Sequence, residues 1–301
     1  KWSVENRNYF WDEVWNFFNV IGEKGVHPYL KPENSLPGTK FFPNGMLNYA
    51  ENMLKKSDND IAINFWSEDK VKKKLSWQDL KNQVAAVANY FKMKGIQKGD
   101  RVAAYLPNIP ETIIVMLASS SIGAIFSSAS PDFGVEGVLD RFGQIEPKML
   151  ITTDGYNFNG EEINITEKVE KVVSSLRSVN DIVLVPLLNS GEIFSSNKVI
   201  LYQDLLNNYK SDTIDFIKLK LDHPLYIMFS SGTTGKPKCI VHSAGGVLLK
   251  HLVEVGLHSN AQEKKKFFYF TTCGWMMWNW LVSSLMLNST ICLYDGSPFY
   301  P

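Results

Sequence analysis

The residues best suited to chemistry form one short polar stretch between two apolar runs. Ser230-Ser-Gly-Thr-Thr-Gly-Lys-Pro-Lys238 holds four hydroxyl side chains, two glycines and two lysines within nine residues. Glycines let backbone N–H groups turn toward an anion, hydroxyls donate hydrogen bonds, and a lysine adds a mobile positive charge. This composition predicts a loop that wraps a phosphate or another anionic group.

The loop differs from the common P-loop of nucleotide-binding proteins. That pattern needs four residues between its glycines, followed by lysine and a hydroxyl residue. Here two threonines separate the glycines, and a proline follows Lys236. An ordinary surface hairpin is the alternative, because Gly, Ser and Thr are common in turns. The apolar runs 225–229 and 239–242 favour a functional loop held between two strands of a rigid scaffold.

The elements that must position this loop alternate between strand-like and helix-like patterns. Such alternation predicts βαβ units and a mainly parallel sheet. Ser76 is expected to cap one helix that stops at Gly95, and Ser130 with Asp132 to cap another. We expect strands at 61–65, 101–106, 124–127, 149–153 and 181–185, helices at 77–94, 111–122, 135–145 and 166–179, and a charged turn at 70–74.

Two apolar regions lie outside this alternating pattern. Near the start, Phe10, Val14 and Phe18 recur at helical spacing, which predicts an aromatic helix packed on a larger body. The stretch 267–294 has no charged residue and is long enough to span a bilayer. Its hydroxyl and amide side chains, and Gly274, divide it into strand, loop, helix and strand. We therefore expect buried core and no stable membrane insertion.

Charge and composition exclude several classes of protein. Thirty-one basic residues balance thirty-one acidic ones, so no overall field favours nucleic acid. Hydrophobic residues make up 45% of the chain, as in globular proteins. Three cysteines without paired spacing favour a reducing, cytosolic setting, and the five histidines show no metal-binding spacing. A catalytic role for Cys239 is not expected, because only Lys238 and His242 could activate it.

The polar stretch resembles the signature [ST]-[ST]-G-[ST]-T-G-x-P-K of the adenylate-forming enzymes. Residues 99–111 and the N-terminal segment 47–54 are similar to the acetyl-CoA synthetase branch of that family. Within the branch, 239–246, 275–280 and 294–298 look most like the members that act on acetoacetate. The resemblance implies an α/β large N-terminal domain with layered, mainly parallel sheets. It divides the chain into an N-terminal extension, 1–60, and an AMP-binding domain, 61–301, incomplete at its C-terminus and without the small C-terminal domain.

The resemblance also implies a ligase reaction with ATP, Mg²⁺ and coenzyme A. Acetoacetate would be activated to acetoacetyl-CoA through an acyl-adenylate, releasing AMP and pyrophosphate, in the cytosol and in ketone-body or lipid metabolism. By the same resemblance, the acyl and pantetheine pocket would contain Trp275, Met276 and Met277. The predicted ATP-phosphate residues are Ser230, Ser231, Gly232, Thr233, Thr234, Gly235 and Lys236.

Several alternatives stay open at this point. Residues 275–280 could be plain core, since Trp and Met are mostly buried. Met277 replaces the small Thr of acetyl-CoA synthetases, yet acetate or another short acid is an alternative substrate. A noncatalytic nucleotide-binding scaffold is the alternative from another class. The family's metal-binding Glu, its adenylation lysine and the arginines that hold the coenzyme A nucleotide are not found here, so we expect this chain alone to be nearly inactive.

Overall fold

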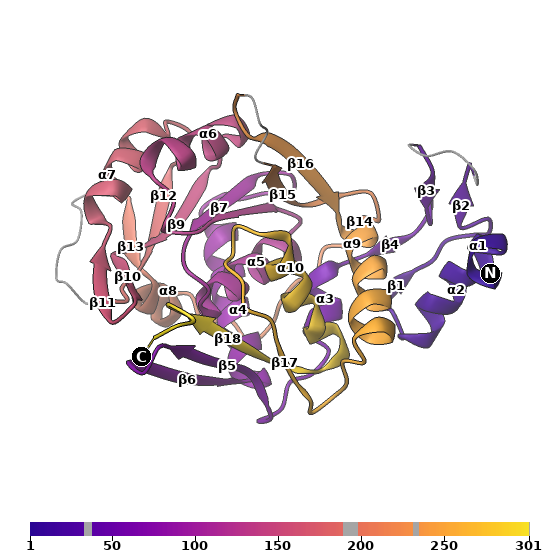
Figure 1. The fold of residues 1–301 in the computed structure, drawn as a ribbon. Coiled ribbons are helices and arrows are strands. Elements are labelled where there is room, and N and C mark those ends of the chain that lie inside the picture. Colours follow the sequence, from indigo (N-terminus) through magenta and orange to yellow (C-terminus); the bar gives the residue numbers. More distant parts are fainter. Residues whose placement is uncertain (33–37, 189–197, 231–234, 301) are drawn as a thin grey trace.

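The main sheet of the protein has seven strands in the order β13-β12-β9-β7-β8-β15-β16 (Figure 1). This computed structural model describes residues 1–32, 38–188, 198–230 and 235–300. Every neighbouring pair is parallel except β15 and β16. The mainly parallel sheet expected from the sequence is therefore confirmed. Its strands are β7 (Arg101–Tyr105), β8 (Ile125–Ala129), β9 (Met149–Thr153), β12 (Asp181–Val185), β13 (Val199–Leu201), β15 (Pro224–Ser230) and β16 (Lys238–Ser243).

Helices cover both faces of this sheet because successive strand residues point to opposite sides. In β7, Val102 and Ala104 join one core cluster, whereas Ala103 and Tyr105 join a second cluster on the other face. The first face packs against α4 (Trp77–Met93) and α5, and the second against α6 (Val135–Ile145) and α7 (Thr166–Ser175). All residues of α5 (Pro110–Ser121) are buried.

A second sheet lies on the far side of α4 and α5, giving the layered arrangement seen in Figure 1. Its strand order is β17-β18-β5-β6, and only the β5–β6 pair is antiparallel. Ile63 and Phe65 of β5 share a core cluster with Met149 of the main sheet. Its strands are β5 (Ile61–Ser67), β6 (Val71–Ser76), β17 (Lys266–Phe268) and β18 (Thr290–Asp295).

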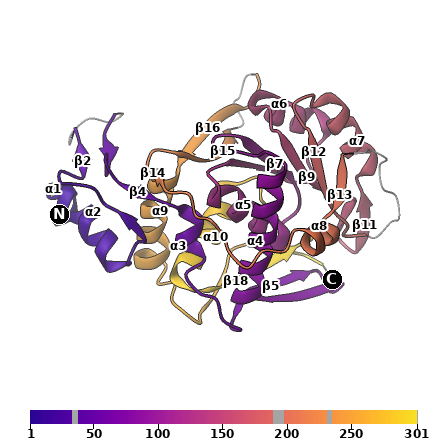
Figure 2. The same cartoon turned by 180° about the vertical axis from the view of Figure 1, so that it is seen from behind.

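The N-terminal elements lie at one end of the molecule, opposite α7 (Figure 2). The expected aromatic helix is α2 (Arg7–Phe17), which buries Val14 and Trp15 and packs Phe10 against the same core. The elements of this end are α1 (Trp2–Glu5), α3 (Tyr49–Met53), β1 (Gly22–Glu23), β2 (Leu30–Lys31), β3 (Lys40–Phe41), β4 (Met46–Leu47), β14 (Leu219–Lys220), α9 (Ala244–His251) and the π-helix Leu252–His258.

The charge-free stretch near the end of the chain is core only in part: Trp278, Leu281 and Leu285 are buried, whereas Phe268, Tyr269, Phe270 and Trp275 are exposed. It contains β17, a loop, α10 (Met276–Val282), the 3₁₀ helix Ser283–Leu287 and β18, the order expected from its polar residues. Within the described ranges, no helix has the length and apolar character needed to cross a membrane. The remaining elements are the hairpin β10 (Gly155–Phe158) and β11 (Glu161–Asn164), and helix α8 (Tyr202–Asn208).

Of the two helix caps expected from the sequence, one prediction is confirmed and the other is wrong. Ser76 accepts from the Asp79 backbone N–H, while the Asp79 carboxylate accepts from the Ser76 N–H, a complete capping box. The expected cap of α6 by Ser130 and Asp132 is wrong, because its N-cap is Gly134 and has no side-chain cap bond. The Tyr105 hydroxyl donates to the backbone carbonyls of Pro131 and Phe133, which holds residues 131–133 in a turn before the helix begins.

The charged turn expected at 70–74 is also wrong in its extent. Most of it is strand β6, whose lysines are exposed at the edge of the second sheet. Lys72 lies over the ring of Trp66, 5.0 Å from its centroid, and Lys73 pairs with Glu111 at 3.5 Å. Lysines on an edge strand discourage pairing with other chains, so a strand and a charged run coexist here.

Candidate functional site

The described part of the predicted phosphate loop joins two paired strands. Ser230 ends β15 and pairs with Lys238, the first residue of β16, so both apolar flanks are strands as expected. Ser231, Gly232, Thr233 and Thr234 lie outside the described residues. Gly235 has φ of +92° with open space around its α-carbon, a conformation that favours glycine.

Helix α6 contacts the C-terminal part of this loop. The Lys236 Nζ lies 3.6 Å from Asp140 Oδ1, and Gln144 Nε2 donates to the Pro237 carbonyl at 2.8 Å. The Lys236 side chain is 75% exposed, so this ion pair is weak and readily exchanged. The ammonium group is therefore free to exchange Asp140 for another partner.

The loop begins at Ser230, the carboxyl end of β15, which is parallel to β8, and this is the edge where open α/β sheets bind ligands. The segment after β17 crosses the ends of two strands of the main sheet. Ser128 Oγ donates to the Cys273 carbonyl at 2.6 Å, and Cys273 Sγ donates to the Leu106 carbonyl at 2.7 Å. These two hydrogen bonds fix Cys273, which lies just before the predicted acyl residues 275–277, against the carboxyl ends of β7 and β8 in the main sheet.

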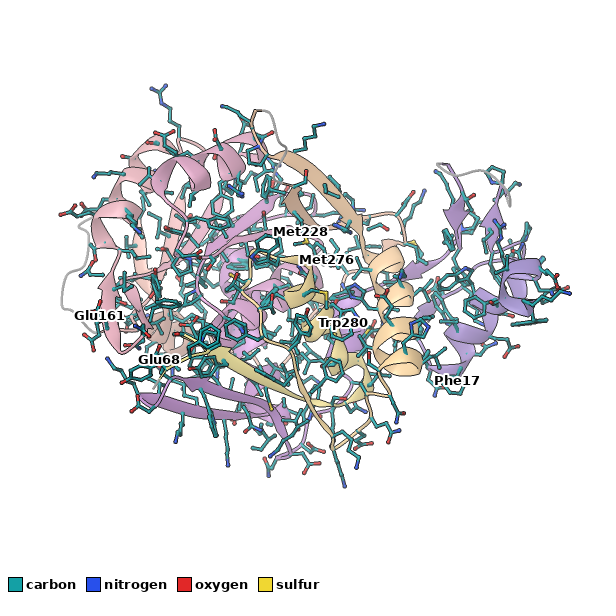
Figure 3. All side chains as sticks on the ribbon, in the orientation of Figure 1. Phe17, Glu68, Glu161, Met228, Met276 and Trp280 are labelled. Carbon is teal, nitrogen blue, oxygen red and sulfur yellow. The ribbon has the colours of Figure 1, made fainter. Side chains whose placement is uncertain are left out.

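Trp275, Met276 and Met277 lie at the start of α10, and they differ from the buried residues that follow. Trp275 is 60% exposed, both methionines are half-buried, and Trp278 is fully buried against Phe126. Plain core packing therefore describes Trp278 but not Trp275. Figure 3 labels Met276 of α10 and Met228 of β15.

Helix α10 connects the two predicted parts of the site. The Asn279 side-chain amide donates to Met228 Sδ at 3.4 Å, and Met228 lies two residues before the end of β15. The strand that leads into the phosphate loop thus touches the helix that begins with the acyl segment.

Sequence reasoning missed three polar residues beside this edge: Asn108, Glu68 and Asp295. Asn108 lies between the strand expected at 101–106 and the helix expected at 111–122, and it is 2% exposed and hydrogen-bonded on every polar side-chain atom. Glu68 is buried and accepts from the backbone N–H groups of Asn159, Gly160 and Ser297. The only signal for Asn108 in the sequence is that a polar side chain stands among the apolar residues of 106–110.

Asp295 ends β18 in a setting that disfavours its charge. Burial raises the pKa of Asp295 to about 7, the carboxylates of Glu68 and Asp132 add to that rise, and the Asn108 backbone N–H opposes it. That N–H donates to Asp295 Oδ1 at 3.4 Å. Asp295 therefore changes charge near neutral pH, next to the segments of the candidate site.

The other candidate groups show no activation. Cys239 is exposed, burial of its sulfur raises the pKa of the thiol, and its nearest polar partner is Gln144 at 3.7 Å. Burial lowers the pKa of His242, whose ring lies tilted against that of Tyr226, with the centroids 5.2 Å apart. Among residues placed in the structure, no group of three His, Cys, Asp or Glu side chains is arranged to hold a metal ion.

A wide hollow of about 620 Å³ lies away from this edge. It runs over the outer face of the second sheet and is lined by Trp66, Lys266 and Phe268 among others. It has no glycine-rich loop and no contact with β15 or α10. The chemistry of the phosphate loop therefore places the candidate site at the carboxyl edge of the main sheet rather than in this hollow.

Comparison with known protein families matches residues 50–301 to the family described as AMP-binding enzyme. Among curated proteins, the chain is 47% identical to an acetoacetyl-coenzyme A synthetase of Rhizobium meliloti (strain 1021) and 43% identical to an acetoacetyl-CoA synthetase of Gallus gallus. Both alignments cover 100% of this chain and 46% of the relative. A malonamoyl-CoA synthetase of Penicillium aethiopicum is 35% identical, over 99% of this chain and 43% of that protein.

A solved structure gives the same picture of the fold. The acetoacetyl-CoA synthetase from Streptomyces lividans matches with a TM-score of 0.94 and 37% identity, over 100% of this chain and 46% of that chain. The chain thus spans about half the length of the curated relatives it matches.

Proposed function

The chain belongs to the AMP-binding enzyme family, and we propose that it carries the ATP-phosphate and acyl-binding parts of an acetoacetate–CoA ligase. The observation that carries the proposal is the placement of the loop between β15 and β16. It begins at the carboxyl edge of the main sheet, and its leading strand touches the helix that begins with Met276. The acetoacetyl-CoA synthetases named above support the choice of acid.

The proposed reaction has two steps. A carboxylate oxygen of acetoacetate attacks the α-phosphorus of ATP, the bond to the bridging oxygen breaks, and pyrophosphate leaves. The coenzyme A sulfur then attacks the acyl carbon, the thiol proton is lost to solvent, and AMP leaves. For such transfers the protein mainly positions reactants and stabilises charge.

The phosphate-binding role is assigned to Ser230–Lys236. Lys236 would exchange Asp140 for a phosphate oxygen, and backbone N–H groups freed by the glycines would complete the cradle. Thr233 and Thr234 are proposed donors that lie outside the described residues. Mg²⁺ is proposed to arrive with the triphosphate, as it usually does with nucleotides. A cytosolic setting is part of the same proposal.

A second candidate is the activation of a different short acid on the same site. It is favoured by the malonamoyl-CoA synthetase from Penicillium aethiopicum, which is 35% identical and whose name indicates another acyl group. Met277 and Met228 would then shape a pocket for that acid instead. Substrate shape in an apolar pocket separates such acids by only about 10- to 200-fold per methylene-sized change.

The test is acid-dependent pyrophosphate exchange by the full-length gene product. Exchange with acetoacetate at least tenfold above that with acetate supports the proposal. Faster exchange with another short acid supports the second candidate. Nucleotide binding without exchange for any acid favours a noncatalytic scaffold and contradicts both.

A further inference from the structure

Asn108 occupies a fully satisfied buried position between three segments. Its side-chain amide donates to the Thr271 and Tyr294 carbonyls, both at 3.2 Å, and its Oδ1 accepts from Trp278 Nε1 at 2.9 Å. The side chain is 2% exposed, so water cannot replace a lost bond without reorganising the site.

Two of these hydrogen bonds hold the two ends of the segment 271–278. Thr271 and Trp278 stand on either side of the predicted acyl residues 275–277, and both are held by the same side chain. The third bond, to Tyr294, ties that stretch to the end of β18. Asn108 itself follows β7 of the main sheet, so one amide fixes the acyl segment relative to both sheets.

We propose that Asn108 is a positioning residue for acid selection, holding residues 271–278 so that Trp275, Met276 and Met277 define the width of the acyl pocket. This inference rests on the proposed function. Asn108 itself does not contact the acid. It acts through the segment it holds, since small displacements of positioning groups cost large factors in rate.

Two substitutions in the full-length gene product separate this role from plain stability. Asn108→Asp removes both amide donors, and Trp278→Phe removes the indole N–H with its five-membered ring and keeps a six-membered ring in the core. The matched control is Asn48→Asp. Asn48 is also fully buried, and its amide donates to the carbonyls of Ser120, Ser121 and Ile217, away from the acyl segment.

The readout is the KM for acetoacetate against the KM for ATP, with the preference for acetoacetate over acetate. We expect Asn108→Asp to raise the KM for acetoacetate about tenfold and to reduce the acid preference, with the KM for ATP changed less than twofold. Trp278→Phe should change the same quantities in the same direction, by a smaller factor. Asn48→Asp should lower the melting temperature without changing either ratio.

Equal changes in both KM values, or an unchanged acid preference in both test variants, would overturn the inference. The same shift in the Asn48→Asp control would overturn it as well. If Asn108→Asp does not fold, Trp278→Phe decides alone, because both amide donors of Asn108 remain in place. A wild-type protein without exchange for any acid contradicts the proposed function, whereas an active wild type with unshifted variants contradicts only this inference.

Discussion

At the scale of single residues, Lys236 is the described group that most directly tests phosphate binding. Its ammonium is exposed and its ion pair with Asp140 is loose, so it contributes little to stability. We predict that Lys236→Ala in the full-length protein lowers the adenylation rate by about 10²- to 10³-fold. Pyrophosphate exchange measures this rate.

The matched control is Lys171→Ala, which removes an exposed lysine of α7 that lies outside the predicted phosphate loop. That variant should exchange at the wild-type rate. Equal rates for Lys236→Ala and the wild type would contradict the phosphate-binding assignment of Lys236.

Asp295 gives a prediction about pH. Its pKa is raised to about 7 in the folded protein, so the folded state binds a proton that the unfolded state releases near pH 4. The bound proton therefore contributes to the free energy of unfolding at low pH, and this contribution is lost as the pH rises through 7. Asp295→Asn keeps an oxygen for the Asn108 N–H but carries no charge. It should be more stable than wild type by about 1 to 2 kcal/mol at pH 8, with a smaller difference at pH 5.

Urea unfolding at the two pH values measures this difference. Asp69→Asn, an exposed carboxylate in the adjacent turn, is the control and should show no such pH dependence. A stability gain of the same size at pH 5 and pH 8 would mean that the charge of Asp295 is not its cause.

At the scale of elements, Glu68 joins three turns with one carboxylate. It follows β5 and accepts from Asn159 and Gly160 at the tip of the β10–β11 hairpin and from Ser297 after β18, at 2.7 to 3.0 Å. Hydrogen bonds to a buried charge are stronger than neutral ones. Glu68→Gln replaces an acceptor oxygen by a donor facing these N–H groups, and we predict a loss of about 2 to 3 kcal/mol.

Thermal or urea unfolding of the purified chain measures that loss. Glu161→Gln is the matched control, since this exposed carboxylate lies on the same hairpin (Figure 3). It should change stability by less than about 0.5 kcal/mol. A Glu68→Gln variant as stable as this control would show that the three turns do not depend on the carboxylate.

The elements themselves were largely predictable because their signals are local. Helix α4 could be delimited from Ser76 and Gly95, since caps and left-handed glycines act within one turn. The α6 cap could not, because a hydroxyl from the distant residue Tyr105 holds the chain that precedes it. The role of Asn108 was hidden for the same reason: its partners lie more than 160 positions along the chain.

At the scale of the whole molecule, the strand pairing of the second sheet could not be predicted from local sequence patterns. β5 and β18 were each expected as strands, but their parallel pairing joins Ile63 to Ile291 across most of the chain. Nothing in either strand specifies the other, because register is set by the shared core between the sheets. The position of the candidate site could not be predicted for the same reason. The acyl segment lies between β17 and β18, so its place depends on how these two strands pair.

The two cores predict how stability is distributed over the molecule. Helix α5 is buried along its whole length between the sheets, whereas α2 buries only Asn8, Val14 and Trp15. Opening α5 requires separating both sheets, so its amides should exchange only through global unfolding. Amides of α2 should exchange through a local opening that costs at least about 2 kcal/mol less. Native-state hydrogen exchange, read by mass spectrometry with increasing urea, measures both. If the protection of α2 equals that of α5 and follows the same urea dependence, the N-terminal elements unfold with the main core, and the idea of a separately opening N-terminal end is wrong.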